Sequence, residues 1–324
     1  MRRAGEVATL FFVVRLAIRM HPSIRLIAID WGTSSARAYA LDANGGLVSE
    51  RSAPLGIQRI ADGNFADALA TLCGGAIPDA MPLLASGMIG SRQGWVEAPY
   101  CACPAGFAAI AAGLARVAGT NLRIVPGLIC HDEADTPDVM RGEETQIFGA
   151  LAEGDSAPRV IVLPGTHSKW AIIRDARVAT FATFMTGELY ALLRQHSILG
   201  RLAIDSADDA ALGRGVRASL RDDAALIHDL FSARTLALTG ALASEGVADY
   251  LSGLLLGAEI AAGRRWLQRQ HLAAAPVTLI GDATLCARYR QAMEVAGIAA
   301  TLGPADAAAL GLWKIAVHAG MLKR

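Results

Sequence analysis

A short sequence pattern occurs twice in this chain of 324 residues. In each copy an apolar run rich in β-branched residues stops at a glycine and a threonine: residues 26–31 run into Gly32-Thr33-Ser34-Ser35, and residues 160–164 run into Gly165-Thr166-His167-Ser168. Apolar segments separated by polar turns follow each copy, which predicts a strand that continues into a hairpin. Two such units in one chain indicate an internal duplication. The order of strands and helices in each half predicts an α/β fold.

The first turn has the residue types of a phosphate site. Glycines and hydroxyl residues let backbone N–H groups and side chains point at a phosphate, and Gly32, Thr33 and Ser34 supply them here. Asp30 ends the strand before the turn, where its carboxylate can hold Mg²⁺ through water. The alternative is a plain hairpin with small turn residues, and the second copy of the turn favours the phosphate site.

Composition limits the classes of protein to which this chain can belong. Its length suggests two domains of ordinary size. Thirty basic and thirty acidic residues give a formal net charge of zero without a basic stripe, so no nucleic-acid partner is predicted. Five cysteines without a disulfide pattern indicate a reducing cytoplasm. No segment approaches a transmembrane span, so no membrane association is predicted.

Residues 1–23 are expected to lie outside the folded domains. Basic residues followed by the apolar stretch 8–18 imitate a signal peptide, but Arg15 and Arg19 interrupt it and no cleavage site follows. Met20 stands just before the first strand. We therefore interpret residues 1–23 as an N-terminal extension from an upstream start codon, either disordered or folded as a loosely packed helix.

A polar loop follows the predicted strand at residues 82–87. Loops of this kind, rich in glycine and hydroxyl groups, often bind small ligands at the end of a strand. Arg92 in this loop could clamp a carboxylate through two hydrogen bonds, or could be an exposed arginine in a connection.

Acidic residues gather just before the second copy of the pattern. Those at 131–138 lack helical ligand spacing and lie among turn-forming residues, so we interpret them as a solvated loop. Glu143 and Glu144 begin a predicted helix at 141–151. Either could face the space between the two units as a general base, or could simply favour the helix N-terminus.

The second half of the chain is mostly helical. Residues 202–271 are predicted to be helical throughout, with small residues at 250–260 that allow close helix packing. A strand at 277–280 ends at Gly281, where the turn could pass under an adenine or a ribose or could be an ordinary connection to the next helix. The other expected elements are helices at 65–72, 186–199, 285–295 and from 303–306 to about 318, and strands at 122–125 and 298–302.

The duplicated turns resemble those of the actin–hexokinase–chaperone ATPase superfamily, in which two ribonuclease-H-like domains close over ATP. The closer resemblance is to the 2-dehydro-3-deoxygalactonokinase family, and it covers the chain from about residue 24 to its end. The segments that carry it are 29–34, 85–91, 141–146, 163–170, 185–189 and 250–259.

This resemblance implies a domain organisation and an activity. Residues 24–155 would form a sugar-binding domain and residues 156–324 a nucleotide-binding domain, whose last helix could pack back on the first. The activity would be ATP-dependent phosphorylation of the terminal 6-hydroxyl of 2-dehydro-3-deoxy-D-galactonate in galactonate breakdown, which makes the protein a phosphotransferase with an alcohol acceptor. Its partners would be the sugar acid, ATP and Mg²⁺.

The resemblance also implies roles for single residues. Thr33 and Ser34 would hold the γ-phosphate, while the second turn takes the β- and γ-phosphates from the other domain. Asp30 would anchor Mg²⁺ in the catalytic site, and Glu143 would take the proton of the acceptor hydroxyl. The implied nucleotide-binding residues are Gly32, Thr33, Ser34, Gly165, Thr166, Ser168 and Gly281. The implied substrate-binding residues are Ser86, Gly87, Met88, Ser91 and Arg92.

Several alternatives stay open. Related carbohydrate kinases have an aspartate where this chain has Glu143, which is one methylene longer, so Glu144 and Asp30 remain candidates for the base. The acceptor could be the C4 epimer derived from gluconate, because a sequence pattern does not resolve the configuration of one hydroxyl. A nucleotide-switched scaffold ATPase of the same superfamily is a further interpretation. The oligomeric state, including a homodimer, also stays open.

Overall fold

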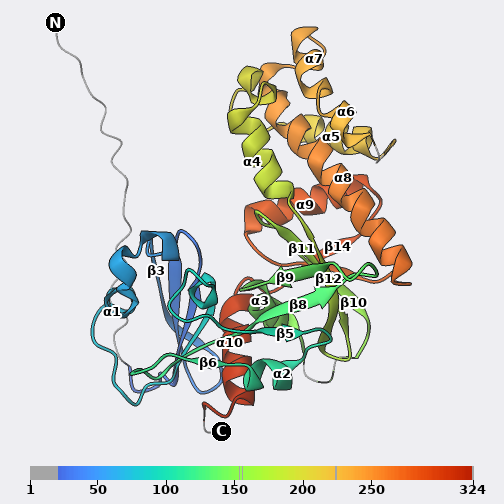
Figure 1. The fold of residues 1–324 in the computed structure, drawn as a ribbon. Helices are drawn as coiled ribbons and strands as arrows, with labels where there is room; N and C mark the ends of the chain where they lie inside the picture. The colour runs from blue at the N-terminus through green and yellow to red at the C-terminus, as the bar shows by residue number, and fades with distance from the viewer. Residues whose placement is uncertain (1–20, 153, 155, 223–224, 323–324) are drawn as a thin grey trace, which may run out of the picture.

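The computed structural model describes residues 21–152, 154, 156–222 and 225–322. The expectation for the N-terminal extension lies outside the described residues up to residue 20, and Pro22 and Ser23 form a turn ahead of the first strand. Figure 1 shows the N-terminal sheet on the left in blue, the later sheet and its helices on the right, and the red α10 (Ala307–His318) beside the first sheet.

The first sheet has the strand order β3-β2-β1-β4-β7-β6. β1 pairs antiparallel with β2 and parallel with β4, and β7 continues the parallel part. The strands are β1 Leu26–Trp31, β2 Ala36–Leu41, β3 Leu47–Ala53, β4 Leu83–Gly87, β6 Ala115–Arg116 and β7 Leu122–Ile124.

The second sheet repeats this topology in the order β12-β11-β10-β13-β14. β10 pairs antiparallel with β11 and parallel with β13, just as β1 pairs with β2 and β4. The strands are β10 Arg159–Leu163, β11 Ser168–Arg174, β12 Arg177–Phe184, β13 Val277–Leu279 and β14 Ala300–Leu302. The internal duplication predicted from the sequence is therefore confirmed.

Glycines with left-handed backbone angles stand at equivalent places in both sheets. Gly87 (φ 91°) ends β4, and Gly281 (φ 146°) follows β13. A Cβ atom on Gly87 would lie 2.8 Å from the carbonyl oxygen of Trp31, and one on Gly281 would lie 3.4 Å from that of Pro164. These carbonyls belong to the last residue of β1 and to the residue directly after β10. The chain turns close to the central strand in both units, in a conformation that favours glycine.

A separate small sheet, in the order β5-β8-β9, lies between the two main sheets (Figure 1). Its strands are β5 Tyr100–Ala102, β8 Gly127–His131 and β9 Pro137–Met140. One buried cluster contains Leu26 and Leu84 of the first sheet, Ile161 of the second, and Leu312 and Ile315 of α10. α10 therefore packs on the first sheet, and the core continues from one unit into the other.

The helices cover the sheets and extend the second unit. Their bounds are α1 Phe65–Cys73, α2 Phe107–Ala112, α3 Glu143–Ala150, α4 Thr186–His196, α5 Asp209–Ser219, α6 Leu226–Asp229, α7 Ser232–Leu238, α8 Val247–Arg269 and α9 Ala283–Val295. Short 3-10 turns are η1 Ile57–Arg59, η2 Ala61–Gly63, η3 Met88–Gly90, η4 Leu199–Leu202 and η5 Ser244–Gly246.

The helical region after β12 differs in part from the sequence prediction. The prediction of a continuous helical segment over residues 202–271 is wrong, because α5, α6, α7 and α8 are separate helices. Gly240, which has a φ of 71°, lies in the connection between α7 and α8. The predicted close packing is confirmed: a Cβ atom on Gly253 of α8 would lie 2.2 Å from the Leu212 carbonyl oxygen of α5. Gly215 meets the Tyr250 carbonyl in the same way, at 2.2 Å. The two helices therefore touch backbone to backbone.

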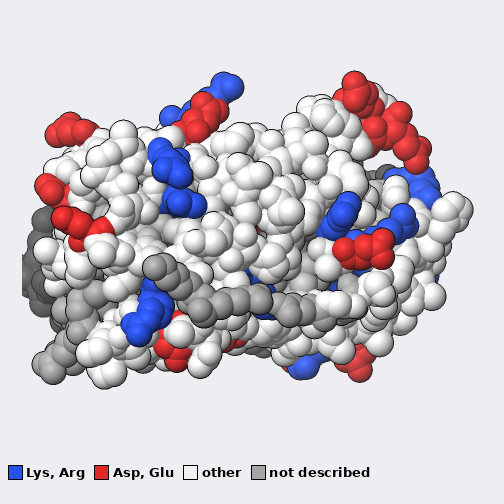
Figure 2. Space-filling model, turned by 90° about the horizontal axis from the view of Figure 1, so that it is seen from below, with Lys and Arg blue, Asp and Glu red and all other residues white. Residues whose placement is uncertain are grey.

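The surface carries its charges in small groups. On the face drawn in Figure 2, lysine and arginine side chains stand singly or in small groups, several of them beside acidic ones, and much of the surface is uncharged. That face has no continuous basic strip of the kind that binds a nucleic-acid backbone. Among the described residues, no helix combines the length and apolar character needed to cross a membrane.

Candidate active site

The site begins where β1 ends. The Asp30 carboxylate lies beside Gly87, since a Cβ atom added to that glycine would lie 3.6 Å from Asp30 Oδ1. A Cβ atom on Gly142, directly before α3, would lie 3.2 Å from the Gly87 Cα. Burial raises the pKa of Asp30, and the positive charge of Arg37 opposes this rise. The ends of β1 and β4 and the start of α3 therefore converge around one carboxyl group.

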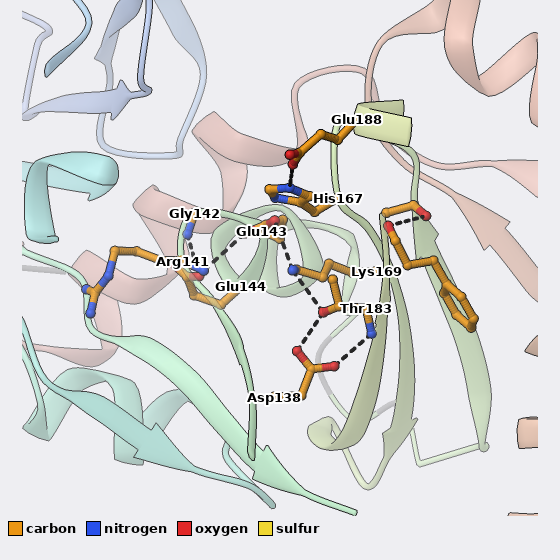
Figure 3. A network of polar contacts seen from close by, with 11 residues as sticks. Asp138, Arg141, Gly142, Glu143, Glu144, His167, Lys169, Thr183 and Glu188 are labelled. Carbon is orange, nitrogen blue, oxygen red and sulfur yellow. Dashed lines mark hydrogen bonds and ion pairs between the residues drawn. The ribbon is translucent and has the colours of Figure 1, made fainter. Parts of the chain in front are cut away.

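Glu143 is the first residue of α3, and its side chain extends toward Lys169 (Figure 3). Its Oε2 accepts a hydrogen bond from the Arg141 backbone N–H (3.1 Å), and its Oε1 lies 4.0 Å from Lys169 Nζ. The side chain is 27% exposed. Burial raises the pKa of Glu143, whereas the positive charge of Lys169 lowers it. Glu143 is thus a partly exposed acidic side chain, and a general base must be accessible in order to meet a substrate.

Glu144 has a different environment. Its Oε2 accepts a hydrogen bond from the Gly142 backbone N–H (2.6 Å), and its Oε1 is buried without a hydrogen-bond partner among the described residues. Burial, together with the negative charge of Glu143, raises the pKa of Glu144 to about 8. A fully buried carboxyl group does not meet a substrate hydroxyl, so the burial of Glu144 favours Glu143 as the base.

Glu144 should make the stability of the protein depend on pH. The usual pKa of a glutamate is 4.5, so between about pH 5 and pH 8 the folded protein keeps a proton here that the unfolded chain releases. Stability is expected to fall as the pH rises through this window, by a few kcal/mol, since one pKa unit corresponds to about 1.4 kcal/mol. Chemical denaturation at about pH 5 and pH 8 should show a smaller loss for Glu144→Gln than for the wild type.

The matched control for this experiment is Glu133→Gln, because Glu133 is an exposed glutamate in the turn between β8 and β9. The stability of the Glu133→Gln variant should change with pH as that of the wild type does. An equal loss of stability for the wild type and Glu144→Gln would contradict the prediction.

A chain of polar contacts continues from Glu143 into the second unit (Figure 3). Lys169 Nζ on β11 donates to Thr183 Oγ1 (2.9 Å), and Thr183 Oγ1 donates to Asp138 Oδ1 (2.6 Å). The Thr183 backbone N–H donates to Asp138 Oδ2 (2.7 Å). Lys169 is only 5% exposed. These contacts join β9 to two strands of the second sheet.

This chain of contacts corrects one interpretation of the sequence. The solvated loop expected at 131–138 is right for its middle, where Asp132 Oδ1 accepts the backbone N–H groups of Ala134 and Thr136 (2.9 and 2.8 Å). It is wrong for Asp138, which lies in β9 and binds Thr183. Sequence reasoning assigned no role to Lys169, although a lysine inside an otherwise apolar strand is an unusual residue to bury unless it is paired.

A cavity of about 660 Å³ lies beside the second glycine–threonine turn. Thr166 is exposed there, and its carbonyl oxygen accepts the backbone N–H of Glu188 in the first turn of α4. The N-terminus of a helix is a favourable place for a phosphate group. Asp249 and Arg288, which also line the cavity, form an ion pair of 2.6 Å. The other polar lining residues are Thr186, Tyr190, Asp205, Ser206, Ser252, Asp282 and Tyr289.

Ser168 does not lie on the exposed part of this turn. Its hydroxyl is fully buried and donates to Glu259 Oε1 (2.8 Å). Trp170 Nε1 donates to the same oxygen and the Tyr289 hydroxyl to Oε2, each at 2.8 Å. Burial raises the pKa of Glu259 against the effect of these donors. Ser168 therefore ties the turn to α8, and Gly165 and Thr166 are the residues of the turn that border the cavity.

The first turn is exposed to solvent, and backbone hydrogen bonds from η1 support it. Thr33 and Ser34 are exposed, and the Gly32 and Thr33 carbonyls accept the backbone N–H groups of Ile57 and Gln58 in η1 (3.1 and 3.2 Å). Side chains at Thr33 and Ser34 are therefore available to a ligand. Gly281 precedes the lining residue Asp282 without lining the cavity itself.

The candidate substrate residues are divided between two environments. Ser86 is buried, and its Oγ accepts a long hydrogen bond from Thr145 Oγ1 (3.4 Å) at the start of α3. Ser91 Oγ donates to the carbonyl of Met88 (2.8 Å). The Arg92 side chain is 87% exposed, and its Nε lies 3.0 Å from Glu97 Oε1. Ser86 and Gly87 thus adjoin Asp30 and α3, whereas Arg92 lies on the surface.

Comparison with known proteins identifies the family of this chain. Residues 30–315 match the family described as 2-keto-3-deoxy-galactonokinase. The chain is 38% identical over 289 residues to the 2-dehydro-3-deoxygalactonokinase of Escherichia coli (strain K12), which covers 88% of this chain and 94% of that protein. The chain belongs to this kinase family. The family and the kinase class predicted from the sequence are therefore confirmed, and with them the use of ATP.

Relatives of the 2-keto-3-deoxy-galactonokinase family also include a solved structure. A Sinorhizobium meliloti protein with the same kinase name has a crystal structure that superposes with a TM-score of 0.81 at 35% identity, covering 90% of this chain and 98% of that one. A Rhizobium meliloti (strain 1021) relative is 36% identical over 306 residues, covering 89% of this chain and 97% of that protein. Together with the repeated strand order, these matches confirm the predicted fold class of two similar α/β units.

Proposed function

We propose that this protein transfers the γ-phosphoryl group of ATP to the 6-hydroxyl of 2-dehydro-3-deoxy-D-galactonate. The observation that carries the proposal is the cavity beside Gly165 and Thr166, next to the N-terminus of α4. A nucleotide in that cavity would direct its phosphates toward the glycine–threonine turn, where backbone N–H groups and a helix N-terminus are available. The name of the Escherichia coli relative supports the choice of acceptor.

The two turns would hold the triphosphate from opposite units. Gly165 and Thr166 border the cavity and would bind the β- and γ-phosphates, while Ser168 supports them from the core. Gly32, Thr33 and Ser34 would bind the γ-phosphate from the first unit. The exposure of the Thr33 and Ser34 side chains supports this role. Phosphoryl transfer depends mainly on positioning and charge stabilisation, which two converging turns can provide.

Asp30 fits a role in holding Mg²⁺. This ion keeps several waters and takes its protein ligands from one or two carboxylates, with substrate phosphates supplying others. Asp30 presents such a carboxylate at the end of β1, beside Gly87. Among the described residues, no group of three or more His, Cys, Asp and Glu side chains could hold a metal ion. When bound, the ion would neutralise charge on the phosphates.

Glu143 would act as the general base for the acceptor hydroxyl. Its side chain is partly exposed at the start of α3, in the segment that also brings Gly142 against Gly87. We propose that the sugar acid lies near Ser86, Gly87, Met88 and Ser91. Arg92 would bind the substrate carboxylate only after it leaves Glu97, to which it is paired.

The test is ADP release by the purified protein with Mg-ATP across a panel of 2-keto-3-deoxy sugar acids, with no-sugar and EDTA controls. Turnover should strongly favour the galactonate-derived acid and stop when EDTA removes Mg²⁺. Preference for the gluconate-derived epimer would keep the mechanism and change the acceptor. ATP hydrolysis without any sugar, or no turnover with any acid, would contradict the proposal and favour the scaffold ATPase.

We also propose a cytoplasmic location. All five cysteines lie within the described residues and are free thiols, which supports a reducing compartment. A homodimer stays a proposal that size-exclusion chromatography with light scattering can test directly.

A further inference from the structure

We propose that Lys169 is a positioning residue that holds the Glu143 carboxylate in place across the junction of the two units. This inference rests on the proposed role of Glu143 as the base. It assigns a function to a lysine that stands in β11, outside both glycine–threonine turns.

Lys169 is held on the side of the second sheet. It is paired in register with Thr183 on the neighbouring strand β12, and its Nζ donates to Thr183 Oγ1 (2.9 Å). Its side chain is 6% exposed, so its conformation is fixed by packing. An ammonium group has three donors, and the bond to Thr183 leaves donors for the carboxylate of Glu143, whose Oε1 lies 4.0 Å away.

Asp138 fixes the direction of the bond between Lys169 and Thr183. A threonine hydroxyl has a single proton to donate. Thr183 Oγ1 gives it to Asp138 Oδ1 (2.6 Å), while the Thr183 backbone N–H donates to Asp138 Oδ2 (2.7 Å). The remaining capacity of Oγ1 is as an acceptor, which is what the ammonium needs. Asp138 therefore orients Thr183, and Thr183 orients Lys169.

The charges around Glu143 show why a positioning group is needed there. The nearby carboxyl group of Asp30, at the end of β1, interacts unfavourably with an ionised Glu143. At the start of α3, the hydrogen bond from the Arg141 backbone N–H holds only the Oε2 atom of Glu143. Lys169 is the cation that faces Oε1 from the other unit. Without it, the Glu143 side chain would be free to turn away from Asp30 toward solvent.

Two other roles for Lys169 make different predictions. A lysine that binds a phosphate of ATP directly would raise the KM for ATP and act independently of Glu143. A lysine that only fills space would affect folding and leave kcat of the folded protein unchanged. A residue that acts through Glu143 should instead lower kcat, and its effect should vanish once Glu143 can no longer serve as the base.

The experiment is a double-mutant cycle of Lys169→Met and Glu143→Gln, measured by ADP release at saturating substrates. Lys169→Met alone should lower kcat by about 10- to 100-fold, with the KM values for ATP and the sugar acid within about threefold of wild type. In the Glu143→Gln background the same substitution should lower kcat by less than about threefold. Thr183→Val, which removes the acceptor for Lys169, should show the same dependence with a smaller effect.

The matched control is Lys314→Met. Lys314 of α10 contacts the other end of α3, where it donates to the backbone carbonyls of Gly149 and Leu151 (2.7 and 2.6 Å). Lys314→Met should change kcat by similar, small factors in the wild type and in the Glu143→Gln enzyme. Thermal melting of every variant separates folding from catalysis. If Lys169→Met does not fold, Lys169→Arg and Thr183→Val complete the same cycle.

The outcomes distinguish this inference from the function on which it rests. Equal factors for Lys169→Met in both backgrounds, or a raised KM for ATP with unchanged kcat, would overturn the positioning role and leave Glu143 as the base. A Glu143→Gln enzyme with nearly normal kcat would instead overturn the proposed base, whatever Lys169 does. A loss of kcat that Lys169→Met causes only when Glu143 is intact, and not in the Glu143→Gln enzyme, would support both the positioning role of Lys169 and the role of Glu143 as the base.

Discussion

Replacing Glu143 by glutamine is expected to lower kcat by about 10²–10⁴-fold, the usual contribution of a single general base. Glutamine keeps the length of the side chain and an oxygen that can accept the Arg141 backbone N–H, but it cannot take a proton from the acceptor hydroxyl. The KM for ATP should stay within a few-fold of wild type, because the cavity at Gly165 and Thr166 is formed by other residues. Steady-state ADP release at saturating substrates measures both constants.

The neighbouring Glu144 provides the matched control for this substitution. Glu144→Gln makes the same chemical change one residue later, in a carboxyl group that is fully buried and bonded to the Gly142 backbone N–H. Its kcat near neutral pH should stay within a few-fold of wild type. A large loss of kcat for Glu144→Gln, with a nearly normal Glu143→Gln enzyme, would exchange the roles of the two glutamates.

The local chemistry of strand ends explains why much of the fold could be predicted. A buried strand that stops at Gly32 or Gly165 is visible in a short stretch of sequence, because apolar residues give way at once to glycine and hydroxyls. The second copy then identifies the duplication. The resemblance that rests on these segments supplied the family, and residues 30–315 match it.

Long-range contacts explain why part of the site could not be predicted. Asp138 looks like one more acid in a polar loop, and only the packing of β9 against β12 brings it to Thr183. Ser168 looks like a phosphate ligand because it follows a glycine–threonine turn, but it already belongs to β11 and its hydroxyl meets Glu259 of α8. Both outcomes depend on how distant elements pack, which local sequence does not encode.

A second large effect is expected from Gly311→Ala, which should destabilise the protein by about 4 kcal/mol or more, an exceptional value for one substitution. The reason is the contact between α10 and α3. A Cβ atom on Gly311 would lie 1.7 Å from the Thr145 carbonyl oxygen, and one on Gly149 would lie 1.9 Å from that of Ala307. These partners are backbone atoms within helices, which cannot move aside as a flexible side chain can.

The sign of the Gly311→Ala effect is itself diagnostic. Helix propensity alone favours alanine over glycine by about 1 kcal/mol, so a helix without this contact would become more stable. Ala308→Gly, the reverse change on the same helix at a partly exposed position, measures that propensity in place. Chemical denaturation of the wild type, Gly311→Ala and Ala308→Gly measures both the cost of the close contact with α3 and the gain from helix propensity. An unchanged or raised stability for Gly311→Ala would show that α10 does not press on α3. The expected loss would mean that the helix carrying Glu143 is held in position by the last helix of the chain.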